Sequence, residues 1–551
     1  MNAIRALLKD RRRRQRGSVL SGVLIIVAFL AIISGALMTE LSTNFLLSTA
    51  LLNRVHTQAT VNSAAELALS QLQGIRLNQS CSATVTTPTL NGQTAVASVV
   101  SCYPTVYEPT KFKPLRSASQ GFMIDGTHTQ IGGLDNYVVG NPDGKVFDYT
   151  FGSVSTRWTL DMNAPITGPT LVTADPGHGN GHQYLVVPYD CPGPDYCLSV
   201  RSDNGSTNPP SEECAITTRE GAVRTLPASS PNFPAVVFYA NGRTLEATDV
   251  TRNGNGSGNN EGNGDNNGCF RADWIQTSLP IVAGPLAFDC ASSCGGAADE
   301  VYVVISDNGR SYLNRYTYGS GNLALAESRS LPWANAIGLA ASGPNLAASL
   351  VITFQGGGVA SVPVGTNGRF GPLDSASVTG SIADAPYWCT LCGNLIGVGT
   401  SNGLYVLDSA LNLYASPSGG SPRISTVPQA DGAGNWYFGA DDGYVYLAQV
   451  QSGQPVMTRN RFGPMSQIGS SVQVDDCNGS TWICVYAGAV NHNTYLIPLD
   501  AHDAVLTACV SSAPPECASG VNPRLWTRVE IGVAADPQAV HVQGWSYFAV
   551  P

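Results

Sequence analysis

The sequence predicts a mainly β protein in which a C-terminal β-propeller follows a long N-terminal apolar helix. Three observations lead to this fold class. An uncharged apolar stretch lies near the N-terminus, a strand-turn-strand pattern recurs through most of the remaining chain, and the composition favours turns over helices. Only 12% of the 551 residues are charged, about half the usual share, whereas there are 59 Gly and 34 Pro. This composition therefore disfavours an all-α or coiled-coil protein.

Charge is distributed unevenly along the chain. The first 17 residues carry seven Arg or Lys and one Asp, a net charge of +6, so the overall charge of -10 leaves -16 for the rest. A strongly negative surface repels phosphate backbones, and we therefore expect no nucleic-acid partner. The even count of 14 cysteines favours an oxidising compartment over the cytosol.

The N-terminal region predicts one long helix. Residues 17–39 contain no charge, and about 20 apolar residues suffice to cross a membrane as a helix. The preceding arginine cluster places the N-terminus in the cytoplasm. Because the first proline is Pro88, the helix can continue to about Leu77. Beyond the membrane, apolar residues at near-helical spacing form a face that requires a partner: Leu41, Phe45, Leu52, Val55, Ala59, Leu69 and Leu72.

The basic leader ends in Arg16-Gly17 and is followed directly by this apolar helix. The arrangement resembles the class III signal of type IV prepilins, and residues 64–69, Ala-Ala-Glu-Leu-Ala-Leu, are similar to the stalk of PilX-type minor pilins. The resemblance implies cleavage after Gly17 by a prepilin peptidase, with Ser18 as the new N-terminus, methylation, and packing against other pilins through the helix. It also implies an inner-membrane protein with a periplasmic C-terminal domain, which then reaches an extracellular pilus tip.

One position departs from the family pattern. Major pilins are expected to carry Glu at the fifth mature position, where it neutralises a neighbouring N-terminal amine, but here the residue is Gly22. A buried unpaired amine is costly, so the chain fits a filament tip or initiation complex better than the repeating shaft. PilX-type minor pilins and the tip pseudopilins of type II secretion are similar in lacking this Glu. The alternative to a prepilin signal is an ordinary uncleaved signal anchor.

A short β segment follows the helix. Cys81 and Cys102 enclose two β-branched runs around Asn91-Gly92, which indicates a hairpin, and we expect this hairpin to pack on the stalk helix. The expected domains are a leader (1–17), a transmembrane helix (18–39), an amphipathic stalk helix (40–79), a small disulfide-closed β segment (80–117) and a propeller (118–551).

The propeller is predicted from a repeated unit, an apolar strand, a tight Asn-Gly or Asp-Gly turn and a second strand. The turn glycines Gly309, Gly357, Gly403 and Gly443 lie 48, 46 and 40 residues apart, a period typical of propeller blades. The unit at 137–158 resembles the PQQ-type repeat. About eight blades are expected, with seven or nine as alternatives. The last blade is expected to end near the C-terminus, at 541–549, and to take its outer strand from 104–125.

The cysteines fall into close pairs, and adjacent pairing is the simplest of many connectivities. The expected disulfides are Cys81–Cys102, Cys191–Cys197, Cys214–Cys269, Cys290–Cys294, Cys389–Cys392, Cys477–Cys484 and Cys509–Cys517. For Cys389-Thr-Leu-Cys392, we expect a disulfide that closes a local loop, and a redox or metal-binding role is the alternative.

Two loops contain candidate metal ligands. The Gly- and Asn-rich stretch 253–268 is predicted to be a mobile loop, and its Glu261 and Asp265 are weak candidates for calcium binding, because the spaced carboxylates of an EF-hand-like loop are absent. Asp175, His178 and His182 share another Gly-rich loop and are weak candidates for a metal site. Because no fourth ligand lies nearby in the sequence, we favour an exposed loop between strands without a metal. We expect no cofactor, with calcium as the alternative.

The main functional hypothesis is a non-enzymatic, minor pilin-like subunit of a type IV pilus or related filament. Its propeller would serve adhesion, partner binding or pilus assembly, and the sequence does not identify the ligand. A PQQ-dependent dehydrogenase is disfavoured because such enzymes resemble one another in a vicinal Cys-Cys bridge, and this sequence has no adjacent cysteines. A membrane-anchored periplasmic scaffold, similar to the propeller of the outer-membrane assembly machinery, is the other alternative. That family is anchored through a lipobox cysteine, whereas the first cysteine here is Cys81.

Overall fold

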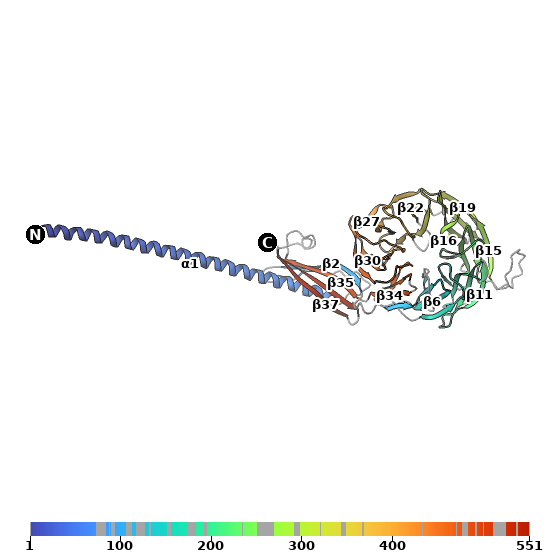
Figure 1. Ribbon diagram of the computed structural model, residues 1–551, viewed down its shortest axis with the longest axis horizontal. Coiled ribbons are helices and arrows are strands. Elements are labelled where there is room, and N and C mark those ends of the chain that lie inside the picture. Colours follow the sequence, from blue (N-terminus) through green and yellow to red (C-terminus); the bar gives the residue numbers. More distant parts are fainter. Residues whose placement is uncertain are drawn as a thin grey trace.

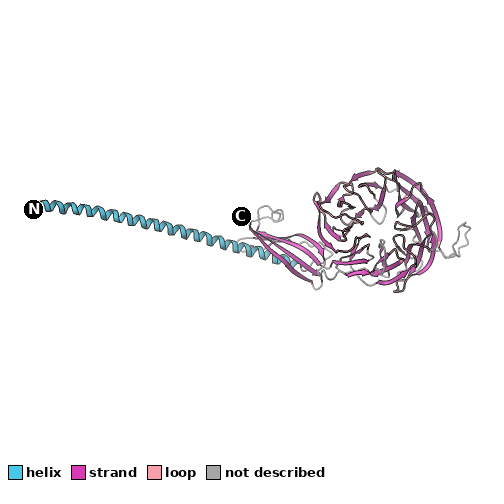
Figure 2. Cartoon of the chain, viewed as in Figure 1, coloured by secondary structure: helices cyan, strands magenta, loops and turns pink. Residues whose placement is uncertain are grey.

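The computed structural model is elongated (Figure 1). A single long helix, α1 (Asn2–Leu72), leads to a small five-stranded sheet, which we call the head sheet, and this sheet joins a ring of blades. Figure 2 shows that the ring consists of strands. The structure describes residues 2–72, 84–86, 89, 94–105, 113–116, 127–131, 134–150, 156–174, 183–191, 195–233, 235–250, 269–290, 298–319, 321–342, 349–365, 368–431, 433–469, 471–476, 483–490, 493–499, 501–510, 525–535 and 538–549.

The head sheet combines strands from both ends of the chain. In spatial order it contains β1 (Thr84–Thr86), β2 (Ala95–Thr105), β35 (Ala501–Val510), β36 (Leu525–Ala535) and β37 (Gln538–Ala549), all antiparallel. The C-terminal part of α1 packs on this sheet with one face of small residues. The buried members of this core are Val61, Ala64, Ala65, Ala68, Ala95, Ala97, Leu506, Ala508 and Val529.

The alanines explain why this helix can lie close to the sheet. Ala64, Ala65 and Ala68 recur at helical spacing, and Ala97 lies opposite Ala508 in the register of β2 and β35. Side chains of one carbon on both surfaces leave little separation between helix and strands. The hairpin expected between Cys81 and Cys102 corresponds to β1 and β2, whose connecting Asn91-Gly92 lies outside the described residues.

The described strands form eight four-stranded blades. Six blades are separate sheets, and two share one eight-stranded sheet because β27 pairs with β31 in parallel. The first four blades are β4 (Thr127–Ile131), β5 (Leu134–Gly140), β6 (Lys145–Thr150), β7 (Thr156–Asp161); β8 (Leu171–Ala174), β9 (Gln183–Asp190), β10 (Tyr196–Asp203), β11 (Ser211–Thr217); β12 (Ala228–Ser229), β13 (Val236–Asn241), β14 (Thr244–Asp249), β15 (Phe270–Gln276); and β16 (Ile281–Asp289), β17 (Asp299–Ser306), β18 (Ser311–Gly319), β19 (Asn322–Ser330).

The other four blades close the ring. They are β20 (Ala336–Ala341), β21 (Ser349–Phe354), β22 (Gly358–Pro363), β23 (Asp374–Ser377); β24 (Tyr387–Cys389), β25 (Leu395–Thr400), β26 (Gly403–Leu407), β27 (Leu413–Pro417); β28 (Gln429–Ala430), β29 (Asn435–Gly439), β30 (Val445–Gln449), β31 (Pro455–Phe462); and β32 (Gln473–Asp476), β33 (Ile483–Gly488), β34 (Asn493–Leu499) with β3 (Lys113–Arg116).

Each seam between neighbouring blades has its own apolar core. The seam between the last and first blades holds Tyr137 and Tyr149 of blade 1 against Cys484, Tyr486 and Leu496 of blade 8. The ring centroids of Tyr137 and Tyr486 are 4.9 Å apart. Since this seam is packed like the other seams, the ring is closed rather than an open arc. The mainly β fold with a propeller and a long N-terminal helix is thus confirmed.

Of the four turn glycines that set the predicted period, Gly357, Gly403 and Gly443 have a positive φ, whereas Gly309 does not. Gly443, between β29 and β30, has a φ of +83°, and an added Cβ would lie 2.4 Å from the Met465 carbonyl oxygen. Gly144, in the corresponding turn of blade 1, has a φ of +87°. Only glycine adopts this region without steric cost, so these positions terminate one strand and start the next at a defined point.

The expected end of the propeller at residue 551 is wrong. The last blade ends at Leu499, and 541–549 lie in β37 of the head sheet. The outer strand of blade 8 does come from the stretch 104–125, as β3, but it completes a blade made of 473–499. The physical reason is strand length. β2, β35, β36 and β37 have 11, 10, 11 and 12 residues, so they pair with one another along their length, which short blade strands cannot match.

Candidate functional site

The exposed surface of α1 is the main candidate site. Among the described residues it is the one helix that is long and apolar enough to span a membrane, with a mean hydropathy of 2.5 over its most apolar window. Its large apolar side chains between Val23 and Val55 are 44% to 75% exposed. Such a surface is stable only in a lipid or protein environment that covers it.

The apolar surface continues beyond the length of one membrane crossing. At 100° per residue, Leu41 and Phe45 point to one side of the helix, Leu47 and Leu51 to a second, and Leu46 to a third. All five are more than half exposed. The sequence predicts a single apolar face for the stalk, but residues 40–55 expose apolar side chains on three sides of the helix. Apolar residues on three sides require several neighbours around the helix, whereas one coiled-coil partner would cover only one side.

A second feature is the junction between the head sheet and the propeller. The Gln449 side chain of blade 7 donates a hydrogen bond of 2.5 Å to the Cys102 carbonyl of β2, and Asn460 donates one of 2.7 Å to Thr105. The Arg459 guanidinium lies 5.9 Å from the Tyr103 ring centroid. The chain leaves the propeller at the end of β34, and a single residue connects β34 to β35 of the head sheet. Two connections and these contacts fix the propeller to the head sheet.

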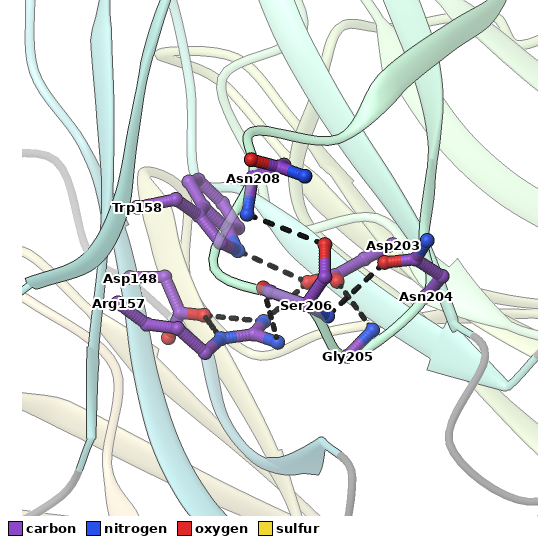
Figure 3. Close-up of polar contacts among 8 residues, drawn as sticks. All are labelled: Asp148, Arg157, Trp158, Asp203, Asn204, Gly205, Ser206 and Asn208. Carbon is purple, nitrogen blue, oxygen red and sulfur yellow. Dashed lines mark hydrogen bonds and ion pairs between the residues drawn. The ribbon is translucent and has the colours of Figure 1, made fainter.

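A buried charge cluster crosses the seam between blades 1 and 2 (Figure 3). The Arg157 Nε donates a hydrogen bond of 2.5 Å to Asp148 Oδ2 on its own blade, and its Nη2 pairs with Asp203 Oδ2 of β10. Its Nη1 donates to the Ser206 carbonyl at 3.2 Å, and the Trp158 indole donates to Asp203. The side chains of Arg157, Asp148 and Asp203 are only 7%, 0% and 3% exposed.

Burial dominates the electrostatics of this cluster. Desolvation raises the pKa of Asp148 to about 6 and the Asp203 carboxylate adds to the rise, while the ion pair with Arg157 lowers it. Asp203 also accepts a hydrogen bond of 2.9 Å from the Gly205 amide, which shapes the loop after β10. Because the three charged side chains are closed to solvent, the arrangement fastens two blades and offers no access to a ligand.

The described cysteines are all in disulfides. Three bonds have both partners described: Cys191–Cys197, Cys214–Cys269 and Cys389–Cys392. The Cys214–Cys269 bond joins β11 of blade 2 to the residue just before β15 of blade 3, whereas the other two bonds close local loops. Four more cysteines are disulfide-bonded, and the partners expected for them lie outside the described residues: Cys102, Cys290, Cys484 and Cys509. Their expected partners are Cys81, Cys294, Cys477 and Cys517.

Most other predicted site residues fall outside the described part of the chain. These are the weak metal candidates Asp175, His178, His182, Glu261 and Asp265, together with the stretch 253–268. Gly17 and Ser18 lie within α1, in the part whose side chains are not described. Among the described residues, no group of three or more His, Cys, Asp or Glu side chains is arranged to hold a metal ion.

Sequence reasoning missed the Arg157 cluster. Asp148, Arg157 and Trp158 all lie in the unit that resembles a PQQ-type repeat, but their partner Asp203 comes from the next blade. The only signal was its position 46 residues after Arg157, close to one repeat period. The cluster formed by Arg219, Arg271 and Trp274, described below, was missed for the same reason, since its members also come from two blades.

Comparisons with known proteins give information on the fold alone. No protein-family model and no curated protein matches the chain. BamB from Moraxella catarrhalis is 14% identical over 70% of this chain and 99% of its own, with a TM-score of 0.44. The Dos1 propeller is 11% identical over 71% and 96%, with a TM-score of 0.49. Sqt1 from Saccharomyces cerevisiae is 12% identical over 70% and 97%, with a TM-score of 0.52, a likeness of fold alone.

Proposed function

We propose that the chain is a pilin-like filament subunit that is anchored by α1 and carries its propeller on the head sheet. The observation that carries the proposal is the length of the exposed apolar surface. From Val23 to Val55, exposed large apolar side chains recur over 33 residues that include the charged Glu40 and Arg54, about 50 Å of helix, whereas a membrane core is about 30 Å thick. The excess is unexplained by a simple anchor, since residues beyond the membrane would then face water.

A filament of packed helices explains this surface. In such a filament each helix is surrounded by several others, so Leu46 and Leu47 on different sides of α1 would both be buried. The packing of Ala64 and Ala68 on the head sheet supports the same arrangement, because it holds the C-terminal part of α1 rigidly and leaves the N-terminal part for assembly. The basic sequence that ends at Gly17, which resembles a prepilin leader, agrees with this use.

Gly22 assigns the subunit to the filament end in this proposal. An added Cβ at Gly22 would meet nothing within 4 Å, so the helix itself does not require glycine there. The absence of a carboxylate at position 22 therefore affects filament assembly and not the helix itself. Without this carboxylate the subunit cannot neutralise the N-terminal amine of a neighbour in the shaft. The propeller, held on the head sheet, would then be presented at the tip for adhesion or partner binding.

N-terminal sequencing tests the leader. In cells with an active prepilin peptidase, the membrane-extracted protein is expected to begin at Ser18, and a Gly17→Ala variant is expected to keep Met1. Recovery of the intact leader from the unaltered protein in those cells would contradict the proposal and favour a membrane-anchored propeller scaffold, the second candidate, for which the broad closed ring is suited.

Cysteine cross-linking tests the filament surface. Single cysteines at Leu46 and Leu47, on different sides of α1, are both expected to cross-link to neighbouring helices when filaments assemble. Leu413→Cys, which is also exposed but lies in the propeller, is the matched control and should remain uncross-linked. Cross-links from only one of the two helix positions would indicate a single partner instead of a filament core.

A further inference from the structure

Two arginines and a tryptophan gather at the outer end of the seam between blades 2 and 3. The Nε atoms of Arg219, which follows β11, and Arg271, in β15, lie 3.7 Å and 3.8 Å from the same oxygen of Glu246. The Arg219 guanidinium also lies 4.3 Å from the Trp274 ring centroid. Glu246 is 1% exposed, but the two arginine side chains are 35% and 31% exposed and Trp274 is 45% exposed. The seam is therefore open to solvent here, unlike the Arg157 cluster.

Among the described residues, the two arginines of this cluster have no hydrogen-bond acceptor for their guanidinium groups. Glu246 is already satisfied, since Tyr239 donates to one oxygen at 3.1 Å and Asn241 to the other at 2.7 Å. Burial raises the pKa of Tyr239, which keeps its hydroxyl protonated as a donor. At their distances from Glu246, neither arginine forms a hydrogen bond within the described structure. A guanidinium has five N–H groups, so both present donors to solvent.

The positions of both arginines are held by the fold. The Cys214–Cys269 disulfide joins β11 of blade 2 to the residue just before β15 of blade 3, five residues before Arg219 and two before Arg271. The Glu220 amide donates a hydrogen bond of 3.0 Å to Asn241, which fixes the backbone next to Arg219 to blade 3. A ligand would therefore meet preorganised donors, and binding would cost little ordering of the protein.

The site lies far from the head sheet. In Figure 1, β11 and β15 are at the edge of the ring opposite to the head sheet and α1. A ligand-binding site on this edge faces away from the membrane and from a filament, whichever anchor the chain uses. This position suits contact with a partner outside the cell.

The charge and the ring together define the ligand. Glu246 pairs with both arginines, and a single carboxylate cannot neutralise two cations, which suits a ligand that carries one anionic group. A chain with a net charge of -10 would repel a polyanion. A guanidinium pairs in a bidentate manner with a planar carboxylate, and a half-exposed indole packs against the C–H face of a ring. We propose that Arg219, Arg271 and Trp274 bind the carboxylate of a terminal acidic sugar on a glycan.

Calorimetric titration of the detergent-solubilised full chain tests this inference without use of filaments. The probes are 3′-sialyllactose, which carries one carboxylate, and lactose, which differs by lacking the acidic sugar. Only 3′-sialyllactose is expected to bind. Arg219→Ala, Arg271→Ala and Trp274→Ala are each expected to weaken binding about tenfold or more, the loss typical of a charge-assisted or stacking contact. Arg423→Ala, an exposed arginine of the propeller, is the control and should bind normally.

Three outcomes would overturn the site. They are equal binding of lactose, no binding of 3′-sialyllactose by the unaltered chain, and normal binding by the three alanine variants. Should an alanine variant unfold, Arg271→Lys keeps the charge but loses the paired N–H groups, and it is expected to weaken binding severalfold with the thermal midpoint unchanged. Tight binding of glucose 1-phosphate in place of the acidic sugar would overturn the carboxylate assignment. None of these results depends on leader cleavage, so the filament proposal stands or fails separately.

Discussion

The Trp158 indole in blade 1 donates a hydrogen bond of 3.2 Å to Oδ2 of Asp203 in blade 2. The same oxygen pairs with Arg157, so one carboxylate oxygen holds two consecutive residues across the seam. The seam also has an apolar core, which includes Trp158, Ile166 and Leu185. This seam therefore depends on buried charge as well as on apolar packing, and its stability should respond both to substitution and to pH.

Arg157→Ala is expected to destabilise the propeller by about 3–5 kcal/mol, because it leaves two buried carboxylates without their cation. The free energy of unfolding can be measured by denaturant titration of the full chain. Arg423→Ala is the control: its side chain is 62% exposed, and loss of its ion pair with Asp441 should cost less than about 1 kcal/mol. Equal losses in the two variants would show that the buried cluster has no special role.

Asp148→Asn is expected to change the pH dependence of stability. The folded pKa of Asp148, about 6, lies above its ordinary value of 3.8, so between these values the folded state binds more protons than the unfolded state. The free energy of unfolding therefore falls as pH rises from about 4 to 6, by on the order of 2 kcal/mol for this group. The Asn variant should lack that part of the slope.

The comparison for this prediction is made at pH 4 and pH 7. The difference in unfolding free energy between the unaltered protein and Asp148→Asn should be larger at pH 4 than at pH 7, in favour of the unaltered protein. Asp441→Asn, a change at an exposed ion pair, serves as the control. A difference that is the same at both pH values would mean that Asp148 keeps an ordinary pKa in the folded protein.

Ala65→Leu is expected to loosen α1 from the head sheet. Ala65 is fully buried against a surface that includes Ala97 and Ala508, and extra methylenes in such a core typically cost about 1–3 kcal/mol. Limited proteolysis should then cleave the helix near 56–72 more rapidly. Leu67→Ala, at a position 46% exposed, is the matched control and should leave the rate unchanged. Unaltered cleavage of Ala65→Leu would contradict the close helix packing.

Gly397→Ala is expected to destabilise the seam between blades 6 and 7. An added Cβ would lie 2.1 Å from the Cζ3 atom of Trp436, which is fully buried and cannot move aside freely. The cost should be about 1–3 kcal/mol, visible as a lower thermal midpoint. Gly356→Ala is the control, because nothing lies within 4 Å of its added Cβ. Similar midpoints for both variants would show that the seam tolerates a shift of Trp436.

Much of the propeller could be predicted from the sequence because its signals are local. The turn glycines mark where one strand of a blade ends and the next begins, and the apolar runs on either side of Gly309 form β17 and β18. The stretch 104–125 does supply an outer strand, β3, but to a last blade at 473–499 and not to the one expected at 541–549. The candidate sites were harder, since Arg157 with Asp203 and Arg219 with Trp274 each join two blades, and no single repeat contains both members of a pair.

The sequence by itself determined the elements: one apolar helix longer than a membrane, strands punctuated by Asn-Gly and Asp-Gly turns, and a period that repeats them into blades. These follow from residue periodicity and turn chemistry within short segments. Only the tertiary structure decided that β35, β36 and β37 leave the propeller and form one sheet with β2, in which β35 pairs with β2 and Ala97 lies opposite Ala508. The reason is that pairing between distant segments depends on matched strand length and on the surface that α1 requires, which no local pattern records.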